Sequence, residues 1–200
     1  RCVFAGGPVT GKTVLVTGGG GAVGNYAVQL ARWGGARVIA TVSNGQQSAD
    51  ALAAGADVVI DRHRDDVVAK VKAETGGRGV DRIVEVDFGG NLPMLLDLVA
   101  VNGAVAAYAT RGNATPTVPF AEVMRRNVTI AGVLLPTSPE AARVEAQADI
   151  LRWLREGPRL HRIAGRFALA ETAAARPRRL VLPHVRARSA RTGPAGRRSE

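Results

Sequence analysis

The chain has 200 residues, of which 46% are hydrophobic and 22% charged, and its formal net charge at pH 7 is +10. This length and composition are typical of a globular domain with a sizeable core. The single cysteine, Cys2, excludes an intramolecular disulfide and a cysteine-rich zinc site. No stretch approaches 18 uninterrupted apolar residues and no signal peptide opens the sequence, so we expect a cytoplasmic protein.

The predicted strands and helices alternate along most of the chain. Short apolar runs predict strands, and segments of about ten residues with helical periodicity separate them. The strands are expected at residues 13–17, 36–42, 57–60, 80–86, 104–109 and 128–135. The helices are expected from the glycines after residue 17 through residue 31, and over residues 46–54, 65–74, 92–101 and 139–156. This order predicts an α/β fold with a mostly parallel sheet.

A glycine-rich turn follows the first predicted strand directly and opens the first helix. It contains G-x-G-x-x-G at Gly19, Gly21 and Gly24. In dinucleotide-binding folds the first glycine allows a tight turn, the second lets the backbone approach a pyrophosphate, and the third lets the helix pack on the strand. Amides at the helix N-terminus then face the anion. The turn therefore predicts a Rossmann-type dinucleotide site.

A second pattern lies just upstream, since residues 6–13 match G-x-x-x-x-G-K-[ST], the phosphate loop of nucleoside triphosphatases. That loop works only between a preceding strand and a following helix. Only five residues precede Gly6, and Thr13 enters a strand. We therefore interpret Lys12 as part of a polar turn that leads into the first strand.

The end of the second predicted strand bears on which dinucleotide is bound. NAD-preferring sites place Asp or Glu about 20 residues past the glycine turn. Val42, Ser43 and Asn44 stand there instead, which permits the 2′-phosphate of NADP. Arg62 and Arg64 could supply the positive charge, or they could form a solvated basic turn. We expect NADPH, with NADH as the alternative.

From the glycine turn onward the sequence resembles the medium-chain dehydrogenase/reductase superfamily, and most closely its zinc-free NADPH:quinone oxidoreductases (zeta-crystallin-like proteins). The matching segments, over about residues 6–175, are 18–24, 26–31, 53–57, 75–81, 103–107 and 128–132. The resemblance implies a six-stranded, doubly wound Rossmann sheet. It also implies hydride transfer from the nicotinamide to a quinone or enone in the complete enzyme.

The resemblance also implies a set of cofactor-binding positions. Many relatives have Lys at the position of Gln47 and an aromatic residue at that of Arg62, so both positions depart from the pattern. The edge strand near residues 128–135 would mediate a homodimer. The complete expected site consists of Gly18, Gly19, Gly20, Gly21, Ala22, Val23, Gly24, Ser43, Asn44, Gln47, Arg62, Ala109, Thr110, Arg111, Val133 and Leu134.

Complete enzymes of this family begin with a separate β-rich catalytic domain, which we expect this sequence to lack. We therefore expect residues 1–12 to be a linker, residues 13–175 the Rossmann domain and residues 176–200 a basic, disordered tail. The similarity stops near Ala175, and residues 176–200 carry eight Arg against one Glu. We attribute this change to a shifted reading frame or a truncated gene, which translation of the other two frames would test. The chain alone is then expected to turn over substrate poorly, and no residue is assigned as catalytic.

Particular residues bear on several alternative functions. The histidines His63, His161 and His184 show no ligand spacing for a metal. A short-chain dehydrogenase needs Lys four residues after a catalytic Tyr, whereas Leu30 and Gly112 follow the two tyrosines at that distance. A cofactor-binding scaffold without activity, and polyanion binding through the arginine-rich tail, stay as alternatives.

Overall fold

The computed structural model describes residues 1–157, 159–163 and 166–171. The predicted tail, residues 176–200, lies outside these residues. The chain forms one compact unit over Arg1–Leu160, and the described part of the second unit contains a short 3-10 helix, η2, at Leu169–Glu171. Residues 1–12 belong to the first unit, and the predicted domain end at residue 175 stays a prediction.

The first unit alternates strands and helices, as expected. The strands are β1 (Thr13–Val16), β2 (Arg37–Val42), β3 (Val58–Asp61), β4 (Val80–Glu85), β5 (Val99–Ala107) and β6 (Thr129–Gly132). The helices are α1 (Ala22–Trp33), α2 (Gly45–Ala53), α3 (Val67–Glu74), α4 (Phe88–Leu98), α5 (Phe120–Arg125) and α6 (Glu140–Glu156), with a 3-10 turn, η1, at Leu135–Thr137.

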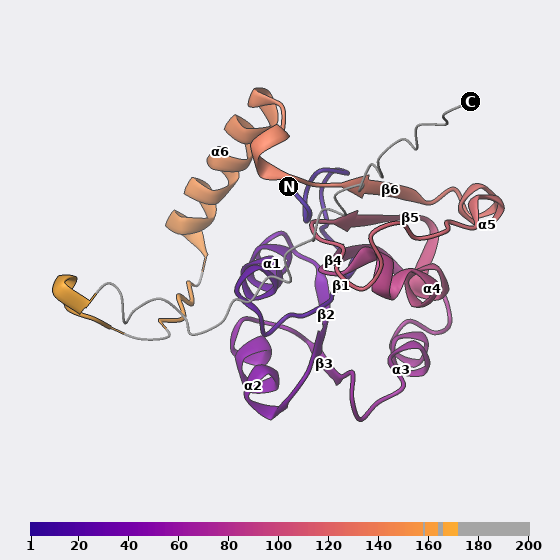
Figure 1. Ribbon diagram of the computed structural model, residues 1–200, viewed down its shortest axis with the longest axis horizontal. Helices are drawn as coiled ribbons and strands as arrows, with labels where there is room; N and C mark the ends of the chain where they lie inside the picture. The colour runs from indigo at the N-terminus through magenta and orange to yellow at the C-terminus, as the bar shows by residue number, and fades with distance from the viewer. Residues whose placement is uncertain (158, 164–165, 172–200) are drawn as a thin grey trace, which may run out of the picture. The chain divides into compact units, whose positions relative to one another are not determined.

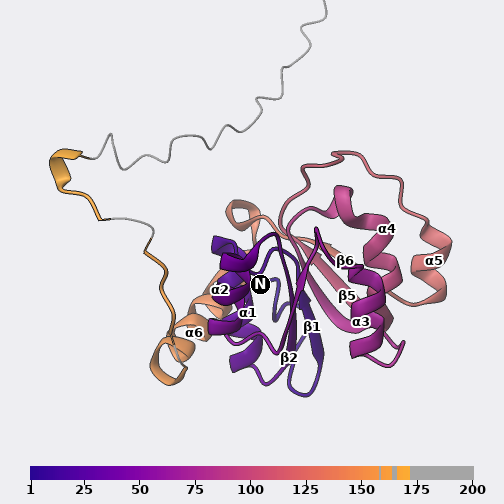
Figure 2. The same ribbon diagram turned by 90° about the horizontal axis from the view of Figure 1, so that it is seen from below.

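The six strands form one sheet in the order β3-β2-β1-β4-β5-β6, and every neighbouring pair is parallel. The predicted doubly wound sheet is therefore confirmed, and it is parallel throughout rather than mostly parallel. Helices α1 and α2 cover one face, and α3 and α4 cover the other (Figures 1 and 2). Because both faces are covered, β1 is buried along its whole length.

Two apolar cores fill the space between the sheet and the helices. Val14 and Val16 of β1 point into the core beneath α1 and α2, together with alanines of those helices. Leu15 of the same strand points into the opposite core, beside Leu95 and Leu98 of α4. Because side chains alternate along a strand, β1 contributes to the cores on both faces of the sheet.

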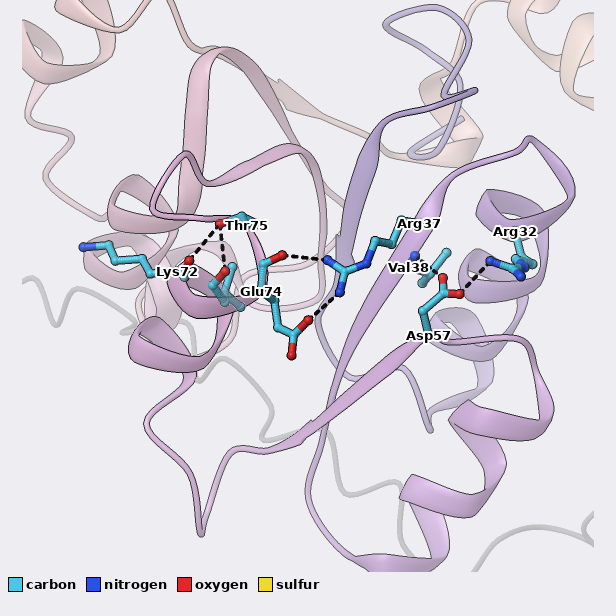
Figure 3. Close-up of polar contacts among 8 residues, drawn as sticks. Arg32, Arg37, Val38, Asp57, Lys72, Glu74 and Thr75 are labelled. Atoms are coloured by element: carbon cyan, nitrogen blue, oxygen red, sulfur yellow. Dashed lines mark hydrogen bonds and ion pairs between the residues drawn. The ribbon is translucent and has the colours of Figure 1, made fainter.

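Polar contacts connect the segments at the amino ends of the strands (Figure 3). Arg37 at the start of β2 donates to the carbonyl of Glu74 at 2.8 Å and pairs with its carboxylate. Asp57, just before β3, accepts from the Val38 amide at 2.8 Å and pairs with Arg32 of α1 at 2.7 Å. These contacts lie at the amino ends of the strands. They do not obstruct the opposite, carboxyl ends of the strands.

The largest departures from the predicted elements concern α4, β5, α5 and β6. Helix α4 begins at Phe88 rather than residue 92, because the Asp87 side chain caps it by accepting from the Gly90 amide. Residues 99–101 belong to β5 rather than to that helix. The short helix α5 was not expected, and β6 ends at Gly132, before the predicted residue 135.

The segment that matches the phosphate-loop pattern does not form one. Thr13 opens strand β1, as expected, and the Lys12 amide closes a turn on the carbonyl of Val9 at 3.0 Å. The Thr13 amide donates to the Asp81 carboxylate at 2.7 Å. With a strand rather than a helix after it, this segment offers no cradle of helix amides to a phosphate.

Candidate dinucleotide-binding site

A cavity of about 620 Å³ opens at the carboxyl ends of β1, β2 and β4. Strand order reverses between β1 and β4, and ligands of open α/β sheets bind in the crevice at such a switch point. The cavity is lined by Thr17, Gly18, Gly21, Thr41, Val42, Ser43, Gln47, Arg62, Val67, Val86, Asp87, Asn91, Met94 and Arg111.

The glycine turn between β1 and α1 forms part of the cavity wall, and its glycines have different roles. Gly18 has φ +66°, so the left-handed turn lies there rather than at Gly19. A Cβ on Gly19 would lie 2.7 Å from the Cβ of Ala40 in β2, and one on Gly24 would collide with the Gly18 carbonyl. Gly19 and Gly24 are therefore required by packing within the protein itself.

Gly21 differs from those two glycines because it faces the cavity. A Cβ there would meet only the Gly18 carbonyl oxygen, at 3.2 Å. Gly21 is also the N-cap of α1, with no side chain that accepts from the first-turn amides and no acidic residue in that turn. The amides of Ala22, Val23 and Gly24 thus lack intrahelical acceptors at a positive helix end, which suits an anion.

At one end of the cavity the structure brings together the expected adenosine-side residues. Arg62 Nε donates to Ser43 Oγ at 2.8 Å, which joins the ends of β3 and β2. Gln47 Oε1 accepts from the Ser43 amide at 2.9 Å. Asn44 is exposed and caps α2 by accepting from the Gln47 amide at 2.9 Å, without lining the cavity.

Arg64, the other arginine considered for the phosphate, does not line this cavity. Its guanidinium lies 3.8 Å from the Asp61 carboxylate, and its side chain is 85% exposed. Of the two arginines considered, Arg62 is therefore the one on the cavity wall.

At the other end, only one of the expected nicotinamide-side residues lines the cavity. Arg111 does so, whereas Ala109, Thr110, Val133 and Leu134 lie outside its wall. Thr110 Oγ1 accepts from the Gly89 amide at 3.1 Å and donates to the Asn113 carbonyl at 2.6 Å. Leu134, just after the edge strand β6, is 60% exposed.

Asp87 is a cavity residue that sequence reasoning missed. Its carboxylate accepts from the amides of Gly90, Arg111 and Gly112, so it fastens the loop after β5 to the start of α4. Burial tends to raise the pKa of Asp87, but the amide donors outweigh it and hold that pKa below its usual value. An Asp between an apolar strand and a Gly-Gly pair was the available signal for this cap.

Glu85, the last residue of β4, contacts two residues of the cavity wall and was also missed. Its side chain is fully buried, and Oε1 accepts from the Asp87 amide at 2.5 Å and from Asn91 Nδ2 at 2.8 Å. Desolvation outweighs these donors and raises the pKa of Glu85 above its ordinary value. The pKa values of Glu85 and Asp87, two residues apart, are thus shifted in opposite directions by their surroundings.

The described residues, 1–157, 159–163 and 166–171, also contain titratable groups outside the cavity. No cluster of three or more His, Cys, Asp or Glu side chains in that part of the chain could hold a metal ion. Burial raises the pKa of Tyr108, the residue after β5, to about 12. Within the same residues, no helix has the length and apolarity needed to cross a membrane.

Comparisons with known proteins identify a family model and similar oxidoreductases. Residues 22–153 match the family model described as zinc-binding dehydrogenase. The chain is 30% identical over 151 residues to quinone oxidoreductase from Homo sapiens, covering 72% of this chain and 45% of that protein. It is 31% identical over 140 residues to prostaglandin reductase-3 from Bos taurus, covering 65% of this chain and 37% of that protein.

A solved structure supports the same grouping. Mycobacterial Rv1454c complexed with NADPH superposes with a TM-score of 0.69 at 28% identity, covering 83% of this chain and 53% of that one. The chain therefore spans about half the length of the relatives that it matches.

Proposed function

The chain belongs to the zinc-binding dehydrogenase family, and from this we propose that it is the NADPH-binding domain of a quinone-reductase-like oxidoreductase. Its relatives include a quinone oxidoreductase and a prostaglandin reductase, so reduction of a quinone or enone is the activity proposed for the whole protein. One observation carries the proposal. The uncapped first turn of α1 faces a cavity at the strand-order switch, behind a glycine whose missing side chain leaves that cavity open.

The residues on the cavity wall fit a dinucleotide. The amides of Ala22 and Val23 would hold the diphosphate, and Gly21 would let it approach the backbone. When bound, NADPH supplies the hydride that the reaction transfers. The chain's own contribution is to bind the cofactor, to orient it and to place its nicotinamide toward the ends of β5 and β6.

Arg62 would select the phosphorylated cofactor. Its Nε is engaged with Ser43, which leaves the two terminal nitrogens of the guanidinium as donors for the 2′-phosphate. Gln47 uses its Oε1 on the Ser43 amide. No carboxylate stands at residues 42–44, so nothing there repels the phosphate.

The nicotinamide side would depend on the loop that Asp87 fastens. Arg111 lines the cavity from this loop, and its own amide is held by Asp87 Oδ1 at 2.6 Å. We propose that Ala109 and Thr110 on the same loop, with Val133 and Leu134 after β6, lie against the nicotinamide in the whole protein. The edge position of β6 also supports a homodimer formed through that strand.

Calorimetric titration of the chain with NADPH and NADH in parallel tests the proposal. NADPH should bind more tightly than NADH, and both should bind at one site per chain. A chain that is folded by circular dichroism and binds neither nucleotide would overturn the proposed function.

A further inference from the structure

The sequence contains two Asn-Gly pairs, Asn44-Gly45 and Asn102-Gly103. In such a pair the glycine amide nitrogen can attack the side-chain carbonyl carbon of Asn, because glycine has no Cβ to obstruct the approach. The new N–C bond forms a succinimide as the C–N bond of the side-chain amide breaks. The glycine nitrogen loses its proton through water, and the departing amide nitrogen gains one and leaves as ammonia. Water then opens the ring to Asp or isoAsp. The net reaction consumes water, releases ammonia and involves no oxidation or reduction.

The pair Asn44-Gly45 is exposed to solvent. A Cβ built on Gly45 would meet nothing within 4 Å. Gly45 is the first residue of α2, so its amide has no intrahelical acceptor. The Asn44 side chain is held by its cap bond to the Gln47 amide, and the first turn of a helix frays readily. Each time the cap opens, the side chain and the Gly45 nitrogen can reach each other.

Asn102-Gly103 is held in place instead. Asn102 has φ +61°, its amide donates to the Arg126 carbonyl at 2.9 Å, and its Oδ1 accepts from Asn127 Nδ2 at 2.8 Å. Gly103 is buried, and a Cβ there would lie 2.6 Å from a Val99 methyl group. The chain thus carries one exposed, unobstructed Asn-Gly pair and one that hydrogen bonds and packing hold in place.

The position of Asn44 gives the reaction a consequence. It directly follows Ser43, at the end of β2, where NAD-preferring Rossmann sites carry the carboxylate that binds the ribose 2′-OH. An Asp at this position caps a helix as well as Asn does, so α2 should keep its start. The new negative charge would stand beside the Ser43–Arg62 pair that is proposed to hold the 2′-phosphate.

We propose that Asn44 is a site of spontaneous deamidation and that the aspartate formed shifts the cofactor preference from NADPH toward NADH. This inference rests on the proposed function. A cavity that selects NADPH through Arg62 alone would lose selectivity when a negative charge is added at the residue next to Ser43, because Ser43 Oγ holds Arg62. NADH has no 2′-phosphate for this charge to repel, so NADH binding should be kept.

The experiment follows both residues in the purified chain during incubation in mildly alkaline buffer. Peptide mass spectrometry measures conversion at positions 44 and 102, and calorimetry measures the affinities for NADPH and NADH before and after. Asn44→Asp isolates the effect of the charge, and Asn102→Asp adds the same charge away from the cavity. Gly45→Ala keeps Asn44 but adds the Cβ that slows the ring closure.

Asn44 should convert several-fold faster than Asn102, and Gly45→Ala should suppress that conversion. In Asn44→Asp the ratio of NADPH to NADH affinity should fall about tenfold, the size expected for one added charge near a phosphate. Asn102→Asp should leave the ratio unchanged. Equal conversion at the two positions, or an unchanged ratio in Asn44→Asp, would overturn this inference. Fresh chain that binds neither nucleotide would instead overturn the proposed function.

Discussion

Arg62 Nε donates a 2.8 Å hydrogen bond to Ser43 Oγ, and this bond ties the residue after β3 to the residue after β2 at the wall of the cavity. The bond fixes the guanidinium by one edge and leaves its other nitrogens available. A single arginine held in this way is a directional receptor for a phosphate group.

Arg62→Gln should weaken NADPH binding about 10- to 100-fold, because a hydrogen bond to a charged group contributes about 1.5–3 kcal/mol. NADH has no 2′-phosphate, so its affinity should stay within about twofold of wild type on the same argument. Arg64→Gln is the matched control, since it removes the same charge from a residue that does not line the cavity. Equal losses for the two nucleotides in Arg62→Gln would contradict the assignment.

Asp87→Ala should loosen the loop after β5 in addition to removing a helix cap. The loss of the cap costs about 1 kcal/mol of stability. The amides of Arg111 and Gly112 also lose their acceptor, so hydrogen exchange at both should accelerate and NADPH affinity should fall.

Asp66→Ala provides the control for Asp87→Ala. Asp66 caps α3 by accepting from the Ala69 amide at 3.0 Å, and no hydrogen bond joins it to the loop after β5 in the described part of the chain. The Asp66→Ala substitution should lower stability by an amount similar to that of Asp87→Ala, without changing amide hydrogen exchange at residues 111 and 112. Identical exchange profiles for the two variants would show that Asp87 acts as a cap alone.

Glu85 should make stability fall as pH rises. Burial raises the pKa of Glu85 in the folded state above the 4.5 of the unfolded chain, so the folded state binds this proton more tightly. The contribution of Glu85 is therefore full below pH 4.5 and is lost as pH rises through its folded pKa. Glu85→Gln keeps an acceptor for the Asp87 amide and does not titrate.

Denaturant unfolding of wild type and Glu85→Gln over a series of pH values measures this difference. The stability of the variant relative to wild type should increase with pH, because the other titrating groups are common to both proteins. Parallel stability curves would mean that Glu85 does not carry a raised pKa.

Local patterns predicted most of the fold. The glycine turn sits between β1 and α1 as its spacing required, and the βα alternation led correctly to a doubly wound sheet. The start of α4 was missed because its apolar periodicity begins only at Leu92, behind the glycines at 89 and 90. Helix α5 was missed because it has six residues and buries only Val123.

The candidate site was less predictable than the fold, since its key contacts join distant residues. The amides of Arg111 and Gly112 meet the Asp87 carboxylate across more than 20 residues of sequence, and no local pattern contains that contact. The same holds for Arg62 and Ser43, whose side chains meet only because β2 and β3 are neighbours in the sheet. Residues such as Ala109 and Val133, assigned by resemblance, are still predictions.

The most direct test of the account is NADPH affinity after substitution at Gly21, measured by calorimetry beside Gly24→Ala. Gly24→Ala should destabilise the fold by about 1–3 kcal/mol, because its Cβ collides with the Gly18 carbonyl. Gly21→Val should stay folded, since its Cβ meets only the Gly18 carbonyl oxygen at 3.2 Å, but its side chain should fill the place of the diphosphate and abolish NADPH binding. Wild-type affinity in folded Gly21→Val would contradict the claim that the first turn of α1 holds the cofactor.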